Sequence, residues 1–194
     1  MKHATSRLLF GYWDSLRGDR AAPERAQIEP GQIRHILADT FILGLEPDGR
    51  AVFRLAGTRI CALFGRDLKG AGFAELWPAE RRKEPEQLLD LVANDTVGAT
   101  AGLIGEADLA AVIGLELVLL PLRFHGATNR RALGALSPSA LPSWLGLTPL
   151  HSLEMRSLRV IGHRRSSAPG MADVGPAAAV RRHGLVLLDG GLSR

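Results

Sequence analysis

Cys61 is the chain's single cysteine, so a thiol nucleophile is the first chemistry to consider. Thiol reactivity requires a basic neighbourhood that lowers the pKa of the cysteine. Arg59 lies close in sequence, but the neighbours Ile60, Ala62 and Leu63 are apolar. This environment predicts a buried thiol that packs as a small hydrophobic side chain.

Other catalytic motifs that can be recognised from their spacing do not occur in the sequence. There is no Gly-x-Ser-x-Gly elbow, His-Glu-x-x-His pattern or paired-cysteine metal motif. Gly70 and Gly72 resemble the start of a dinucleotide-binding loop, but Glu75 stands where the third glycine is needed. Asp90 and Asp95 have no histidine or third carboxylate nearby, which is typical of solvated surface residues. We therefore expect no catalytic residues and no metal site.

An apolar stripe at helical spacing predicts an N-terminal helix that ends at Gly18. The stripe consists of Leu8, Leu9, Tyr12, Trp13 and Leu16. It has two open interpretations: it covers the core of its own domain, or it forms a dimer contact. The second interpretation makes Leu9, Tyr12, Trp13 and Leu16 candidate partner-binding residues.

The order of the remaining elements predicts an α+β fold. Pro47-Asp48-Gly49 is a turn, because proline presets φ and glycine accepts a positive one. Helices are expected from 28–30 onward, around 60–64 and within 78–93, and strands at 40–45, 52–55, 100–106, 114–123 and 131–136. A strand pair, helices and a strand trio predict a five-stranded antiparallel sheet with short helices on one face. The weak alternation over 153–161 leaves open an added strand or an extended arm.

The composition favours one soluble globular domain. Of the 194 residues, 46% are hydrophobic, which suits a single core. The longest apolar stretch, 110–122, contains Glu116 and Pro121 and is shorter than the roughly 20 residues that span a bilayer. The N-terminus has no apolar run of signal-peptide length. A cytoplasmic location is expected, in agreement with the lack of a cysteine pair.

Most of the net charge of +4 lies in the C-terminal tail. From Arg164 onward five arginines stand against two aspartates, so the body of the chain is close to neutral. Binding of single-stranded nucleic acid requires aromatic side chains among basic ones, and the tail has none. Its Ala, Gly, Pro, Ser and Arg content predicts a flexible basic tail over 164–194.

Four segments resemble a family of stand-alone PAS-domain proteins of alphaproteobacteria: YWDSLRG at 12–18, IEPGQIRHIL at 28–37, FRLAGT at 53–58 and LFGRDLKG at 63–70. The resemblance runs from the N-terminal helix to Leu136. It implies a PAS fold and a role in sensing or signalling. N-terminal helices of PAS proteins often form dimer contacts, which is the second interpretation of the apolar stripe.

The cofactor signatures of PAS domains are absent. Flavin-binding photosensory members carry their cysteine in Asn-Cys-Arg-Phe-Leu-Gln, whereas Cys61 lies in Arg-Ile-Cys-Ala-Leu-Phe. Haem-binding members place a histidine on a helix beside the sheet, and 78–93 contains none. His35 and His125 are expected to be solvated or capping residues. We expect neither flavin nor haem.

A pocket between the concave sheet face and the short helices is the remaining candidate site. Alternate residues of a strand share one face, so one set of strand residues points inward and helical residues close the space. The candidate ligand-binding residues are Phe41, Leu43, Phe53, Leu55, Leu115, Leu117, Leu119 and Leu133 from strands, and Cys61, Phe64, Phe73 and Trp77 from the helical side. Arg54 and Glu116 are out of phase and are expected to face away. Either the side chains fill this space as a solid core, or it holds an apolar or amphipathic ligand.

The sequence therefore predicts a cytoplasmic signalling protein that is not an enzyme. Its expected parts are an N-terminal helix and linker (1–27), a PAS core (28–137), a C-terminal extension (138–163) and the flexible basic tail (164–194). It is expected to act through protein contacts, as a homodimer and with an unidentified signalling protein. The alternative is a sensor of an apolar small molecule. Neither a membrane nor a nucleic acid is an expected partner.

Overall fold

The computed structural model describes residues 1–94, 98–108, 111–125, 127–161, 181–182 and 185–186. Its helices are α1 (Ala4–Arg17), α2 (Thr58–Leu63) and α3 (Lys83–Asn94), with 3-10 turns η1 (Arg25–Gln27), η2 (Pro30–Ile33), η3 (Leu37–Asp39), η4 (Phe73–Leu76) and η5 (Ala79–Arg81). Its strands are β1 (Thr40–Leu45), β2 (Ala51–Ala56), β3 (Gly98–Ala107), β4 (Val112–Phe124), β5 (Ala127–Pro138), β6 (Leu150–Ile161), β7 (Arg181–Arg182) and β8 (Leu185–Val186).

The main sheet is antiparallel and has six strands in the order β2-β1-β5-β4-β3-β6. The predicted α+β fold is thus confirmed, but the predicted count of five strands is wrong by one. The sixth strand is β6, which pairs along β3 from Gly98 opposite Ile161 to Ala107 opposite Leu150. The weakly alternating segment is therefore an added strand and not an extended arm.

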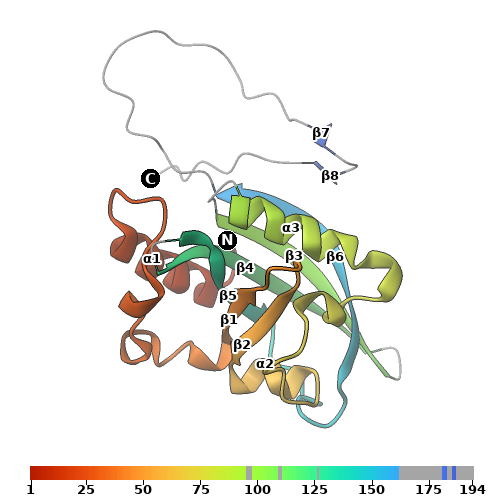
Figure 1. Ribbon diagram of the computed structural model, residues 1–194. Coiled ribbons are helices and arrows are strands. Elements are labelled where there is room, and N and C mark those ends of the chain that lie inside the picture. Colours follow the sequence, from red (N-terminus) through yellow and green to blue (C-terminus); the bar gives the residue numbers. More distant parts are fainter. Residues whose placement is uncertain (95–97, 109–110, 126, 162–180, 183–184, 187–194) are drawn as a thin grey trace, which may run out of the picture.

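Each face of the sheet carries its own buried core. Helices lie against both faces (Figure 1). One face packs against α2, α3 and η4, and we call its buried residues the α3-side core. The other face packs against α1, and we call its buried residues the α1-side core. β4 contributes to both, because Leu117 and Leu119 point to the α3 side and Val118 and Leu120 to the α1 side.

α1 has defined signals at both ends. Nδ1 of His3 accepts a hydrogen bond from the Thr5 N–H, 3.2 Å away, and satisfies one of the unpaired donors of the first turn. The helix ends at Gly18, as predicted, where φ is +56° and the N–H donates to the Asp14 carbonyl.

Two other helical segments are shorter than expected. The helix expected from 28–30 onward is the single 3-10 turn η2, with Pro30 at its first position. The helix expected within 78–93 starts as a regular helix only at Lys83. Pro85 is tolerated there because the N–H groups of a first turn have no partner within the helix.

Most of the predicted tail, 164–194, lies outside the described residues. The exceptions are β7 and β8, which pair with each other in a two-stranded sheet. None of the helices in the described part of the chain has the length and apolar character needed to cross a membrane.

Candidate functional site

Nine of the twelve predicted lining residues are buried together in the α3-side core: Phe41, Leu43, Phe53, Phe64, Phe73, Trp77, Leu115, Leu117 and Leu119. Cys61 is half-buried and packs against the same core. For these ten residues, the side of the sheet that the sequence predicted is therefore correct. The other two, Leu55 and Leu133, do not belong to this core.

Leu55 was wrongly assigned, because β2 contains a bulge. β1 pairs Ile42 with Leu55 but the next residue, Leu43, with Phe53, so Arg54 is an extra residue in β2. Beyond an extra residue the alternation of a strand changes phase. Leu55 consequently leaves the face that Phe53 occupies, and 44% of it is exposed.

Leu133 was wrongly assigned, because the phase of β5 was read one residue off. It lies opposite Ile42 and Leu120 and belongs with them to the α1-side core. Its neighbours in sequence, Ala132 and Gly134, point to the α3 side. Because a strand has a period of two, a shift of one residue moves every side chain to the other face.

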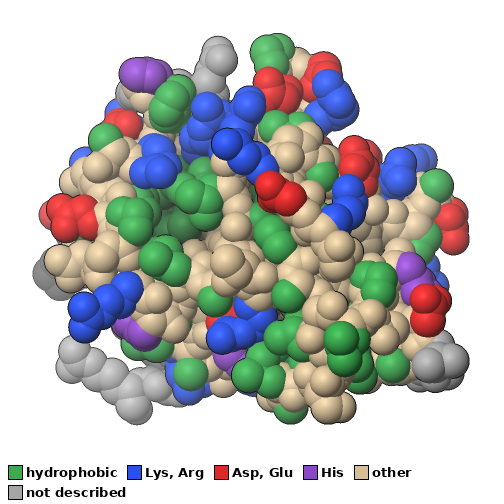
Figure 2. All heavy atoms as spheres, turned by 90° about the horizontal axis from the view of Figure 1, so that it is seen from below, with side chains coloured by type: hydrophobic (Ala, Val, Ile, Leu, Met, Phe, Trp, Pro, Cys, Tyr) green, Lys and Arg blue, Asp and Glu red, His purple; other side chains and the backbone are tan. Residues whose placement is uncertain are grey.

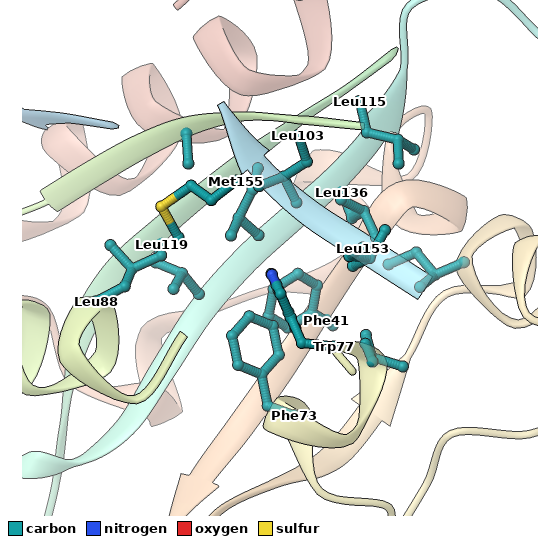
Figure 3. Close-up of a cluster of buried hydrophobic side chains, with 14 of the residues drawn as sticks. Phe41, Phe73, Trp77, Leu88, Leu103, Leu115, Leu119, Leu136, Leu153 and Met155 are labelled. Atoms are coloured by element: carbon teal, nitrogen blue, oxygen red, sulfur yellow. The ribbon is translucent and has the colours of Figure 1, made fainter. Parts of the chain in front are cut away.

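Aromatic rings occupy the centre of the α3-side core, as Figure 3 shows for Phe41, Phe73 and Trp77. The ring centroid of Phe73 lies 5.9 Å from that of Phe41, 5.8 Å from that of Phe53 and 5.2 Å from that of Trp77. These separations are typical of aromatic side chains in direct contact. Side chains thus fill the place where the sequence left a pocket or a solid core as alternatives.

Gly134 makes room for this aromatic packing, and sequence reasoning missed it. A side chain at Gly134 would collide with the ring of Phe41, which lies over β5 at that point. A glycine inside a strand often marks such a close approach. The position of Gly134 in the middle of an apolar strand was the available signal.

Trp77 is the polar exception within this core. Its indole is buried, and its Nε1 has no hydrogen-bond partner among the described residues. Figure 3 shows this nitrogen pointing into the cluster of aliphatic side chains. A buried N–H without an acceptor costs free energy, so it is a polar anchor available to a ligand with an acceptor atom.

The stripe of α1 covers the chain's own sheet. Leu9 and Trp13 are fully buried in the α1-side core, while Tyr12 and Leu16 are half-buried against it. The indole N–H of Trp13 donates to the carbonyl oxygen of Pro121 on β4, 2.8 Å away. The assignment of Leu9 and Trp13 as partner-binding residues is therefore wrong, because both side chains are buried within the chain's own fold.

A cavity of about 370 Å³ lies on the α1 side, next to the start of α1. Four neighbouring strands place residues in one row across its floor, in the order Ser137, Glu116, Gly102 and Ser157. Lys2 and His3 line it from the helix side. This cavity was not predicted, because the residues of its row are polar or glycine and become neighbours only through strand pairing, as Gly102 and Ser157 do from 55 positions apart.

Glu116 holds the start of α1 against the sheet. Its carboxylate accepts the N–H of Lys2 at 2.7 Å and that of His3 at 2.9 Å. Partial burial disfavours the charged form, but the nearby hydroxyl of Ser6 and the two backbone donors outweigh burial, so the pKa of Glu116 lies below its usual 4.5. Glu116 faces away from the leucines of β4, as expected, but it is engaged with α1.

The segment between β5 and β6, residues 139–149, is anchored on one side and exposed on the other. Trp144 and Leu145 pack half-buried against the α3-side core. Leu141 and Leu147 are 63% and 82% exposed, more than any other large hydrophobic residue among those described. This segment lies at the lower end of the molecule in Figure 1. Figure 2 shows the molecule from that end, with hydrophobic side chains on the surface.

An antiparallel sheet with short helices on one face and an N-terminal helix on the other defines the fold class of a PAS sensory or signalling module. Residues 1–137 match the PAS domain family, and the chain belongs to this family. The match ends in β5, so the 139–149 segment and β6 follow it. A comparison with curated proteins found no match. Within the described residues no group of three or more His, Cys, Asp or Glu side chains is arranged to hold a metal.

Proposed function

We propose that this PAS protein works in signalling through protein–protein contacts, first of all with a second copy of itself. The observation that carries the proposal is the exposure of Leu141 and Leu147 on the anchored 139–149 segment. The resemblance of the N-terminal segments to stand-alone alphaproteobacterial PAS proteins supports it. The proposal includes a cytoplasmic location and no enzymatic activity.

Backbone hydrogen bonds keep the exposed leucines in place. The N–H of Leu145 donates to Pro142, and the N–H groups of Leu147 and Thr148 both donate to the carbonyl of Trp144. Gly146 has a φ of +79°, which favours glycine and closes this turn. A leucine held outward in a fixed turn loses little further conformational entropy when a partner covers it.

The packing of the α3-side core also favours protein–protein contacts as the means by which this protein acts in signalling. Aromatic rings of the chain itself contact one another in that core, which supports a role that needs no bound molecule. Covering one leucine side chain contributes about 1.5–3 kcal/mol, and a two-fold dimer uses each contact twice. Four leucines at a two-fold interface therefore supply a useful share of the free energy of association.

Sedimentation velocity over a concentration series tests the proposal. We expect the wild type to dimerise and the double variant Leu141→Asp/Leu147→Asp to remain monomeric. Leu8→Asp is the matched control, because Leu8 is an exposed leucine on the outer face of α1. A wild type that stays monomeric at its highest soluble concentration overturns the homodimer. Dissociation by Leu8→Asp alone would move the contact to α1.

One observation favours a second function, a sensor of a small molecule on the α3 side. The unpartnered Nε1 of Trp77 supplies the polar anchor that an otherwise apolar lining lacks. The rings around it would have to move apart to admit a ligand. Native mass spectrometry of the purified protein is expected to show an added mass that Trp77→Phe loses. A spectrum of apo protein alone contradicts this function.

A further inference from the structure

We propose that the cavity beside the start of α1 is a binding site for a small oxyanion, the carboxylate or phosphate group of a polar metabolite. It lies on the opposite face of the sheet from the α3-side core, and neither Leu141 nor Leu147 lines it. Two of its residues, Ser157 and Arg159, belong to β6, which follows the part of the chain matched by the PAS family. The site thus combines residues of the matched PAS domain with residues of the strand that follows it.

The register of the sheet explains why polar groups converge there. Ser137, Glu116, Gly102 and Ser157 form one row, and in the adjacent row Thr100 lies opposite Arg159. Further along β4 the same face carries Val118 and Leu120, which α1 covers. The face changes from apolar to polar where α1 begins.

Two strand glycines keep the cavity open. A Cβ at Gly102 would lie 2.7 Å from the Ser157 hydroxyl, and one at Gly114 would lie 3.3 Å from the Ser139 hydroxyl. Larger residues at either position would fill the floor and displace the hydroxyls. Glycine within a strand is typical of places where another group must approach the backbone.

Ser137 has a hydroxyl without a hydrogen-bond partner at this site. Its relative exposure is 0%, and its Oγ has no partner among the described residues. A buried hydroxyl is normally paired, so the missing partner points to a group that occupies the cavity. A hydroxyl can donate to an anionic oxygen and needs no negative charge of its own.

Charge decides which kind of ligand fits. Arg159 is exposed and takes part in none of the ion pairs among the described residues, so its planar guanidinium is available for a carboxylate or phosphate. Lys2 adds a second cation at the rim. Glu116 keeps its negative charge while it accepts the N–H groups of Lys2 and His3, so Arg159 and Lys2 together must outweigh it for an anion to bind. A volume of about 370 Å³ admits a small organic acid or a phosphorylated metabolite fragment.

Amide NMR of the full chain tests the site directly, with sodium succinate and sodium phosphate as separate probes. Sodium chloride of matched ionic strength controls for screening. We expect saturable shifts at the amides of Gly102, Gly114 and Ser157. If only succinate gives saturable shifts, the site binds a carboxylate group. If only phosphate does, it binds a phosphate group. Shifts that neither probe saturates, or that sodium chloride reproduces, overturn the proposal.

Variants separate recognition from folding. Arg159→Gln is expected to weaken binding at least about tenfold, because a charge-assisted hydrogen bond is lost. Arg156→Gln is the matched control: Arg156 is on the same strand but pairs with Glu154 and does not line the cavity. Ser137→Ala is expected to weaken binding about fivefold while the apo protein stays folded. Equal affinities of wild type, Arg159→Gln and Ser137→Ala overturn the proposal. None of these measurements depends on dimerisation.

Discussion

The indole N–H of Trp13 donates to the carbonyl oxygen of Pro121, and this 2.8 Å hydrogen bond joins the C-terminal half of α1 to the C-terminal half of β4. The guanidinium of Arg17 lies over the indole ring, with its central carbon 5.4 Å from the ring centroid. Pro121 has no N–H, so its carbonyl is the only hydrogen-bonding group that its backbone can use. The pair makes α1 a structural part of the domain.

Replacing Trp13 is therefore expected to destabilise the monomer. Trp13→Ala should lower the free energy of unfolding by about 3–5 kcal/mol, because it leaves a large cavity in the α1-side core. Trp13→Phe should cost less, about 1–2 kcal/mol, through loss of the hydrogen bond and some packing. Urea denaturation measures both. If Trp13→Ala instead kept wild-type stability and only abolished dimerisation, Trp13 would again be interpreted as a dimer contact.

Glu116 should make the stability of the protein depend on acidic pH. Its pKa is lower in the folded chain than its ordinary 4.5, so the unfolded chain takes up the proton first as the pH falls. The stabilisation is complete above pH 4.5 and is lost as the pH falls through the folded-state pKa. Glu116→Gln should be less stable than wild type by about 1 kcal/mol at neutral pH, and this difference should shrink in acid. Thermal unfolding at several pH values measures it.

The matched control for that experiment is Glu80→Gln, because Glu80 is exposed on η5. We expect it to follow the wild-type pH profile. A constant difference between wild type and Glu116→Gln over the whole pH range would show that the carboxylate charge does not hold α1.

The bulge in β2 predicts opposite outcomes for two nearby residues. Phe53→Ala removes a buried ring from the aromatic centre and should cost about 3–5 kcal/mol of unfolding free energy. Leu55→Ser changes an exposed side chain and should stay within about 0.5 kcal/mol of wild type. Urea denaturation compares them. A large loss for Leu55→Ser would contradict the phase change at Arg54.

Ser137→Ala should stabilise the apo protein. Its hydroxyl is buried without a partner, so its removal relieves a desolvation cost of about 1 kcal/mol. Ser139→Ala, an exposed neighbour at the same cavity, should leave the melting temperature unchanged. Differential scanning calorimetry in buffer without succinate or phosphate makes the comparison. A destabilised Ser137→Ala would mean that the hydroxyl has a partner inside the protein.

The sequence predicted the fold well because its signals are local. Apolar alternation located the first five strands to within a few residues, and Gly18 marked the end of α1 correctly. The weaker alternation of β6 was recognised, but whether it joins the sheet depends on β3, about 50 residues away in sequence. Pairing between distant segments is not encoded in the pattern of either segment alone.

The candidate site was predicted less completely, for three physical reasons. An apolar stripe does not reveal what covers it, so Trp13 was open to two interpretations. One extra residue reverses the phase of a strand, which misplaced Leu55. The cavity residues Ser137, Gly102 and Arg159 become neighbours only through the sheet register, and none of them is distinctive alone.

β4 contributes alternate side chains to both cores, as do β1 and β5, so the two cores do not have separate backbones. Neither core can open without pulling β4 away from the other. The domain should therefore lose both in one cooperative transition, with no state in which only one side has melted. By the same coupling, a ligand bound at the proposed site beside Glu116 should raise the melting temperature of the aromatic core on the far side of the sheet, although no ligand atom would touch that core.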